Sequence, residues 1–362
     1  MPGQTYSTQA GSHEKFKGRM LAKAQPQEML TKLGSMDEIP QNKSELIEWR
    51  RFLPYGGVDN QWMAAGGDTD FINKHIIQEG VTPSADSISW IPKTATLQQI
   101  GCLYSYTDKM RYVHEEGSEV PPEMEEQAAT RLVLAREMMV YGEMKSCTNQ
   151  YFGGTLANTT IAEVDGPPTL DLFQRISRYM LGKHATTVNK MLKSSPNYGS
   201  QSVQASWPVY CHTDMEKTFE NMAGFTKVAD YGSNVQLLDP DYEIGAIGRF
   251  RIIINPILTY LPGAGDLIAQ WQGAGTSPKS DGGTNIDVYP LIIMGRGKNG
   301  GDAFGQVALR GKNSIDPTHI PPSQKSKSDP HGQRGYVGAI TWQAQANLND
   351  DWMAVAFVGT EQ

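Results

Sequence analysis

Residues 119–145 read EVPPEMEEQAATRLVLAREMMVYGEMK, the clearest helical pattern in the sequence. Pro121 and Pro122 suit a first helical turn, and Glu123, Glu125 and Glu126 suit the positive N-terminal end of the helix dipole. Apolar residues recur at steps of three or four, which predicts one buried stripe. The predicted stripe consists of Met124, Ala128, Leu132, Ala135 and Met139. Such a helix would be roughly 36 Å long.

A second helix is predicted over Thr169–Lys193, after Pro167 and Pro168, with Leu172, Ile176, Tyr179, Met180 and Val188 on its packing face. Elsewhere the pattern favours strands, because short runs of β-branched and aromatic residues lie between glycines. The best strand candidates are Ser87–Ile91, Leu97–Tyr106, Ser206–Cys211, Gly248–Ile254, Val288–Met294 and Tyr336–Trp342.

Breakers divide the rest of the chain. Residues 1–58 contain repeated prolines and, apart from a possible helical turn over Ser44–Phe52, are typical of an arm. Thr82–Tyr112 suits a long hairpin or extended loop, and the polar stretches Gly263–Gly283 and Gly311–Gly335 suit surface loops. With 37 Gly and 21 Pro in 362 residues, the sequence predicts a loop-rich α+β fold.

Composition argues against several classes of protein. A net charge of -7 disfavours a protein that wraps nucleic acid, because release of counterions from DNA needs clustered Lys and Arg. It does not disfavour a container whose acidic inner wall lets DNA slide. No stretch is apolar enough to span a bilayer, and no signal peptide begins the sequence, so we expect a soluble protein with no membrane partner. The three cysteines lack metal or disulfide spacing and are predicted to be buried thiols.

Gly295-x-Gly297-x-x-Gly300 follows an apolar run, as a dinucleotide-binding turn would. That fingerprint needs a helix directly afterwards to meet the pyrophosphate, and residues 302–310 do not favour one. Lys298 is not followed by Ser or Thr, so a Walker A loop is also disfavoured. The histidines and acidic pairs lack the spacing of zinc or calcium sites. We therefore predict no catalytic residue, no cofactor and no metal.

Several short segments, in order between residues 85 and 355, resemble one family, the N-four-type major capsid proteins of tailed bacteriophages, which have the Hong Kong 97-like capsid fold. The segments are ATLQQIG at 95–101, Thr107-Asp108, WPVYCH at 207–212, EIG at 243–245, GRFRIII at 248–254, YPLII at 289–293, DPHGQRGYVG at 329–338 and LNDDWM at 348–353. The family tends to have glycine where Tyr242 precedes Glu-Ile-Gly, and the first 80 residues and the loop 263–283 show no resemblance.

The resemblance implies an arm, an extended loop, a spine helix in a peripheral domain and an axial domain. On this sequence the implied parts are the N-terminal arm 1–58, an extended loop region 59–118, a peripheral domain 119–205 with spine helix 119–147, an axial domain 206–290 with surface loop 263–283, and return strands 291–362. The last part completes the peripheral and axial domains.

The implied function is self-assembly into an icosahedral head shell around phage double-stranded DNA. The implied partners are further copies of the chain in pentamers and hexamers, portal, scaffold and decoration proteins, and packaged DNA held by weak, non-specific contact. The implied location is the virion, after synthesis in the host cytoplasm. Two alternatives stay open: an encapsulin-like nanocompartment shell, and a soluble nucleotide-binding α/β enzyme that uses the Gly295 loop.

A charged or titratable cluster follows the strand candidate Leu97–Tyr106. Polar residues of this kind are typical of the rim of a protein interface. We therefore predict that the tip of the extended loop contacts a neighbouring subunit. The candidate contact residues are Asp108, Lys109, Arg111, Glu115 and Glu116.

Overall fold

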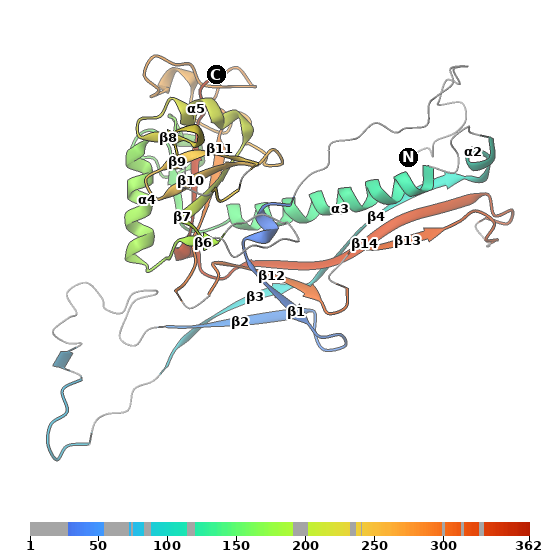
Figure 1. The fold of residues 1–362 in the computed structure, drawn as a ribbon, viewed down its shortest axis with the longest axis horizontal. Helices are drawn as coiled ribbons and strands as arrows, with labels where there is room; N and C mark the ends of the chain where they lie inside the picture. Colours follow the sequence, from blue (N-terminus) through green and yellow to red (C-terminus); the bar gives the residue numbers. More distant parts are fainter. Residues whose placement is uncertain are drawn as a thin grey trace.

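The structure of the chain is a computed structural model, which describes most of its residues (Figure 1). The described residues are 28–53, 72–73, 75–82, 88–113, 120–190, 202–231, 237–239, 241–298, 301–312, 315–325 and 329–362. Of the predicted arm 1–58, residues 28–53 are therefore described, and they form two strands and a short 3-10 turn.

Helix α3 (Val120–Lys145) confirms the predicted long helix. Ala128 and Leu132 of the predicted stripe are buried against strand β4 (Gln98–Thr107). In the last turns the buried side changes to Val140 and Met144, which pack into the main core. The helix therefore lies on one sheet along its first half and reaches a second sheet at its C-terminal end (Figure 1).

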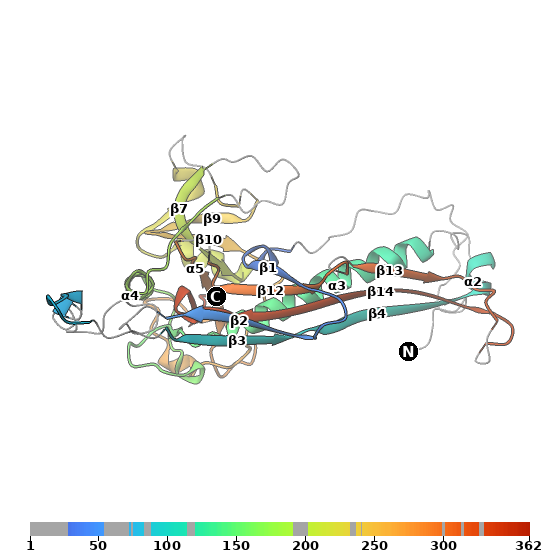
Figure 2. The same cartoon turned by 90° about the horizontal axis from the view of Figure 1, so that it is seen from below.

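The first sheet has five strands built around the long strand β14 (Arg334–Asn347). The other members are β1 (Ser35–Ile39), β12 (Phe304–Leu309), β13 (Asp316–Ile320) and β4. β12, β13 and β4 run antiparallel to β14, and β1 is parallel to β12. Figure 2 shows α3 along one side of this elongated sheet.

The second sheet has eight strands, several of which are buried on both faces. Its order is β5 (Gln150–Phe152), β15 (Met353–Val358), β11 (Tyr289–Met294), β7 (Ser202–Cys211), β10 (Phe250–Ile254), β9 (Glu243–Ile247) and β8 (Phe225–Lys227), with β6 (Val188–Lys190) beside β7. Helices α4 (Leu170–Gly182) and α5 (Glu216–Glu220) cover one face. The last turns of α3 and the loop around Leu258 cover the other.

A two-stranded ribbon projects from the body (Figure 1, lower left). It pairs β2 (Leu46–Phe52) with β3 (Trp90–Thr96) in antiparallel register, from Leu46 opposite Thr96 to Phe52 opposite Trp90. The inner face of the ribbon, with Ile47 and Trp49, packs on a small core.

The hairpin predicted within residues 82–118 is wrong in its pairing. β3 and β4 follow each other in the chain but do not pair, because β3 joins β2 and β4 joins β14. A period-two pattern identifies a strand and not its partner. Ser44–Phe52 was also predicted wrongly. A possible helical turn was expected there, but the segment contains strand β2, which pairs with β3.

The second helix is shorter than predicted. Thr169 caps its start by accepting a hydrogen bond from Leu172 N–H at 3.3 Å. The helix ends at Gly182, His184 has a positive φ of 59°, and Val188 belongs to β6. The predicted loop Gly311–Gly335 also contains a strand, β13.

The expected domain boundaries also differ from the sheets. The stretch 59–118 includes β4, which belongs to the five-stranded sheet. The boundary at 290 divides β11, and β5 and α4, from the stretch 119–205, lie with the eight-stranded sheet, whereas β15 lies in the stretch 291–362 that was expected to complete both domains. Strands from distant parts of the chain complete each sheet, so a linear division cannot separate them.

Two of the three cysteines are buried, as the sequence predicts for all three. Cys147 and Cys211 are buried, and Cys102 is half-buried. Burial raises the pKa of the Cys147 thiol to about 12.

No helix in the described part of the chain is long and apolar enough to cross a membrane.

Candidate functional site

The described glycines of the loop after β11 lie against an aromatic side chain. Gly295 and Gly297 lie next to Trp352, and a Cβ added at Gly297 would collide with the Trp352 ring. Gly300 lies outside the described residues. After the loop the chain enters strand β12 instead of the helix that a pyrophosphate site needs. The two described glycines therefore permit close packing against Trp352.

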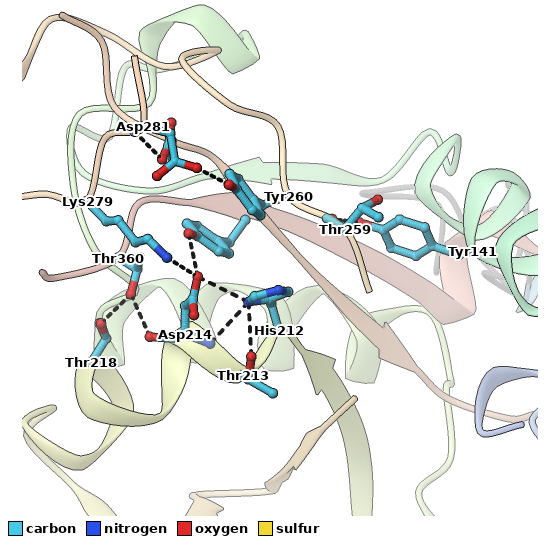
Figure 3. Close-up of polar contacts among 12 residues, drawn as sticks. Tyr141, His212, Thr213, Asp214, Thr218, Thr259, Tyr260, Lys279, Asp281 and Thr360 are labelled. Carbon is cyan, nitrogen blue, oxygen red and sulfur yellow. Dashed lines mark hydrogen bonds and ion pairs between the residues drawn. The ribbon is translucent and has the colours of Figure 1, made fainter. Parts of the chain in front are cut away.

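A polar cluster near the C-terminal end of the chain contains a histidine beside a carboxylate (Figure 3). One carboxylate oxygen of Asp214 accepts hydrogen bonds from Lys279 Nζ at 2.5 Å and Tyr289 OH at 2.9 Å. His212 Nδ1 accepts from the Asp214 backbone N–H at 3.1 Å. Thr360 Oγ1 donates to the Asp214 carbonyl at 3.2 Å.

Burial and nearby polar groups shift the pKa values in this cluster in opposite directions. Burial raises the pKa of Asp214, but the hydrogen bonds from Lys279 and Tyr289, together with the nearby His212 and Lys279, lower it overall. Burial lowers the pKa of His212, partly offset by Asp214. The polar contacts join the segment after β7 to the loop 259–287 and to the C-terminal residues. An open pocket of about 560 Å³ beside them has both basic and acidic lining residues.

Within the described ranges, no group of three or more His, Cys, Asp or Glu side chains is placed to hold a metal ion.

A buried carboxylate on α3 holds the first described residues of the chain. Glu137 is 0% exposed. Its Oε1 accepts from the backbone N–H groups of Met29 at 3.0 Å and Leu30 at 2.7 Å, and its Oε2 accepts from Thr31 N–H at 3.2 Å. Asn255 Nδ2, at the end of β10, also donates to Oε1 at 3.4 Å. Glu137 thus joins the N-terminal segment, α3 and the eight-stranded sheet.

The ribbon β2–β3 and the chain beyond it expose many large apolar side chains. Phe52 and Trp90 at its end meet edge to face with ring centroids 6.2 Å apart. In the described residues 75–82 every side chain is exposed, and Ile76 and Ile77 are 62% and 75% exposed. Contiguous exposed apolar groups usually mark an interaction site.

The five-stranded sheet also has an apolar face that α3 does not cover. Leu103 on β4 is 68% exposed and lies opposite Gly338 of β14, while Ile340 lies opposite Gly101. A Cβ at Gly338 would meet Leu103 Cδ1 at 3.0 Å, and one at Gly101 would meet Ile340 Cγ1 at 2.9 Å. Each glycine therefore makes room for an aliphatic side chain to lie flat across the sheet.

The predicted contact residues lie at the opposite end of the molecule from the ribbon (Figure 1). Asp108, Lys109 and Arg111 belong to the short helix α2 (Asp108–Val113), which directly follows β4. Asp108 is half-buried, and Lys109 and Arg111 are exposed. Glu115 and Glu116 lie outside the described residues. The structure brings three of the five residues together, on the end of the five-stranded sheet and not on the ribbon.

Sequence reasoning missed the apolar segment beyond the ribbon. The run Ile72-Asn-Lys-His-Ile-Ile-Gln-Glu-Gly-Val81 has four large aliphatic residues without the clean period of a buried helix or strand. The available signal was this group of aliphatic residues in a segment without the periodicity of a buried helix or strand.

Comparisons with known proteins agree with this architecture. No protein-family model matches the chain. Over 220 residues the chain is 24% identical to the "Major capsid protein" of Pseudomonas phage KPP21, a match that covers 55% of this chain and 51% of that protein. The match thus spans about half the length of this curated relative.

Three solved structures are similar over nearly the whole chain. The capsid of Ralstonia phage GP4 has a TM-score of 0.59 at 9% identity, with 99% of this chain and 98% of that chain covered. The capsid of cyanophage P-SCSP1u has a TM-score of 0.58 at 11% identity, with 98% and 97% covered. The head structure of Helicobacter pylori bacteriophage KHP40 has a TM-score of 0.57 at 10% identity, with 100% and 98% covered. The chain has the α+β fold of these phage capsid proteins, as the resemblance in its sequence implied.

Proposed function

We propose that this chain is the major capsid protein of a tailed bacteriophage, which self-assembles into the icosahedral head shell around double-stranded DNA. The observation that carries the proposal is the pair of uncovered apolar surfaces on a capsid-type fold: the segment 75–82 and the sheet face around Leu103 and Ile340. The name of the relative from phage KPP21 supports the same assignment.

The shape of the chain suits repeated contacts between copies. A ribbon that projects beyond its own core exposes backbone and apolar groups that a neighbouring copy can cover. Several modest contacts repeated over a shell add up to a stable assembly, because each contact makes the next one effectively intramolecular.

In this assignment the fold divides by sheet. The five-stranded sheet with α3 is the peripheral domain and its spine helix, and the eight-stranded sheet with α4 and α5 is the axial domain. The ribbon β2–β3 and the residues between its strands are the extended loop. Residues 1–27 of the arm expected from the sequence lie outside the described residues.

The partners follow from the same assignment. Other copies of the chain form pentamers and hexamers, and a portal, a scaffold and decoration proteins complete the head. Packaged DNA is contacted weakly, since the subunit carries a net charge of -7. The subunit is made in the host cytoplasm and resides in the virion.

Purified full-length chain, alone or with its scaffold, tests the proposal by size-exclusion chromatography and negative-stain microscopy. We expect capsomers or closed shells. A species that stays monomeric under every assembly condition contradicts the proposal. Particles from infected cells should hold nuclease-protected DNA, whereas an enclosed enzyme would favour the nanocompartment alternative.

A further inference from the structure

An apolar groove with a basic rim lies on the outer side of α4. It runs between this helix and the turn from β9 to β10, with a volume of about 380 Å³. Phe173, Ile247 and Phe250 contribute apolar lining, and Arg178 and Arg249 are the charged lining residues. Among the described residues, no acidic side chain lines the groove.

Both arginines are available to a partner. Arg178 and Arg249 are exposed, and no ion pair joins either guanidinium to a carboxylate in the described part of the chain. The position of Arg249 is fixed by the tight turn before β10, where Gly248 has a φ of 56°. Positive φ is a conformation that glycine adopts without strain.

The opposite face of the same strands carries acidic residues. Phe250 and Ile252 of β10 pack with α4, whereas the alternate residue Ile253 packs with Leu238 and Tyr242 on the other side. Close to this second side lie Asp230 and Asp241, which are exposed, and Asp239, which is half-buried. We call Asp230, Asp239 and Asp241, with Tyr231 and Tyr242, the acidic surface.

A buried ion pair holds the acidic surface in place. Glu243 accepts from Leu238 N–H at 2.6 Å and from Asp239 N–H at 3.4 Å. Arg251 donates to Glu243 at 3.0 Å and lies 5.4 Å from the centre of the Tyr231 ring. These contacts are formed within one subunit and position Tyr231, Leu238 and Asp239 without help from a partner.

From this arrangement we infer that the groove beside α4 receives the acidic surface of a second copy of the chain. Two different, complementary patches on opposite faces of one domain give a head-to-tail contact, which can close into a ring. The inference rests on the proposed function and deepens it: it names the contact that would join neighbouring subunits within a pentamer or hexamer.

Charge reversal tests the contact. The groove variant carries Arg178→Glu and Arg249→Glu, and the surface variant carries Asp230→Lys and Asp241→Lys. Each variant should reduce the yield of capsomers by roughly tenfold or more, because every contact in its ring then joins like charges. The chain with all four substitutions should recover capsomers, since opposite charges meet again.

Mixing gives a second, independent readout. The groove variant has two acidic faces and the surface variant has two basic faces, so an equimolar mixture should form hexamers in which the two variants alternate. Pentamers cannot alternate and should not form. Native mass spectrometry distinguishes these assemblies by composition.

Arg131→Glu, on the exposed side of α3, is the matched control and should assemble as the wild type does. Thermal melting of isolated subunits checks folding. If a reversed variant does not fold, Arg178→Gln with Arg249→Gln and the single change Asp230→Lys take its place, with the same direction of effect expected.

The outcomes separate the two proposals. If the wild type forms no capsomer, the proposed function fails. If the wild type assembles and the reversed variants assemble equally well, the inferred contact alone is wrong. A fourfold variant as impaired as the groove variant would show that the groove binds something other than the acidic surface of a second copy.

Discussion

At the scale of single residues, Glu137 makes an unusual number of contacts between distant segments. One carboxylate accepts hydrogen bonds from three successive backbone N–H groups of residues 29–31 and from the Asn255 amide. A buried charge is tolerated when hydrogen bonds of this kind replace water. The N-terminal segment and the carboxylate therefore depend on each other.

Replacing Glu137 with Gln should destabilise the subunit. The amide nitrogen of Gln would face at least one backbone N–H, leaving a buried donor without an acceptor, at a cost of about 1–3 kcal/mol in free energy of unfolding. Chemical denaturation measures this change. Glu143→Gln, on the same helix and partly exposed, should have little effect, and equal losses for both substitutions would contradict the role given to Glu137.

The same site predicts a pH dependence. Burial raises the pKa of Glu137, the three N–H donors lower it, and the nearby Glu28 raises it, with burial the largest effect. Unfolding exposes Glu137 to water and removes this burial, so the pKa of Glu137 is higher in the folded subunit than in the unfolded chain. The contribution of Glu137 to stability is therefore fully present below the unfolded pKa and is lost as the pH rises through the folded pKa.

Hydrogen exchange at Met29, Leu30 and Thr31 should accordingly show less protection, after correction for the intrinsic rate, as the pH is raised through the pKa of Glu137. In the Glu137→Gln variant the protection should be low and independent of pH. A wild-type protein whose protection at these three amides does not fall as the pH rises would refute this explanation.

At the scale of elements, the ribbon and the helix α2 are the two projecting ends of the molecule (Figure 1). They differ in chemistry. The residues beyond the ribbon expose large aliphatic side chains, whereas α2 combines the charged residues Asp108, Lys109 and Arg111 with exposed Tyr112 and Val113. Aliphatic anchors contribute affinity, and rim charges contribute mainly orientation.

Ile76→Asp and Ile77→Asp should leave the isolated subunit intact and prevent shell formation. Both side chains are exposed in the subunit, so the change in its stability should stay within about 0.5 kcal/mol. Sedimentation measures particles and thermal melting measures the subunit. The conservative pair Ile76→Val and Ile77→Val serves as the control. Full-sized particles from the Asp variants would mean that this segment is not a contact.

Lys109→Glu and Arg111→Glu test the other end. We predict that these variants melt as the wild type does but fail to close shells, because a reversed charge on α2 meets like charge on a neighbour. Both side chains are exposed, so neither change should disturb the core of the subunit. Normal particles from both variants would remove α2 from the contacts, and failure to fold would assign α2 to the core.

At the scale of the whole molecule, the chain is extended (Figure 2). Among the described residues, apolar side chains are exposed both near the ribbon and on the five-stranded sheet. Among the described residues, these side chains lie outside the buried clusters of the subunit. Burial of apolar area on association then favours the assembled state by roughly 25 cal/mol per Å² before the entropy of association is counted.

Assembly should therefore change the exchange of specific backbone amides. Comparing free subunits with particles, we expect slower exchange over residues 75–82 and along β4, and no change at buried amides of the central strand β11, such as Ile292 and Ile293. Unchanged exchange over residues 75–82 in intact particles would show that the exposed aliphatic groups stay exposed in the shell.

Local patterns of residues were enough to predict the helix α3 and the strands β7, β10, β11 and β14, and the resemblance to a family supplied the capsid-type order of segments. These elements have strong local signals: prolines and acids at a helix start, or continuous apolar runs such as Phe250–Ile254 in a strand buried on both faces. Periodicity is a property of neighbours in the chain, so it can be recognised without knowledge of the partners.

The pairing of strands and the location of the uncovered surfaces came from the three-dimensional arrangement alone. β4 finds its partner β14 far along the chain, and Gly338 and Gly101 are explained by the aliphatic side chains that lie across them. The groove beside α4 and the contacts of Glu137 likewise join segments that are distant in sequence. Pairing and burial depend on how the whole chain is arranged, and a single sequence carries no local signal for them.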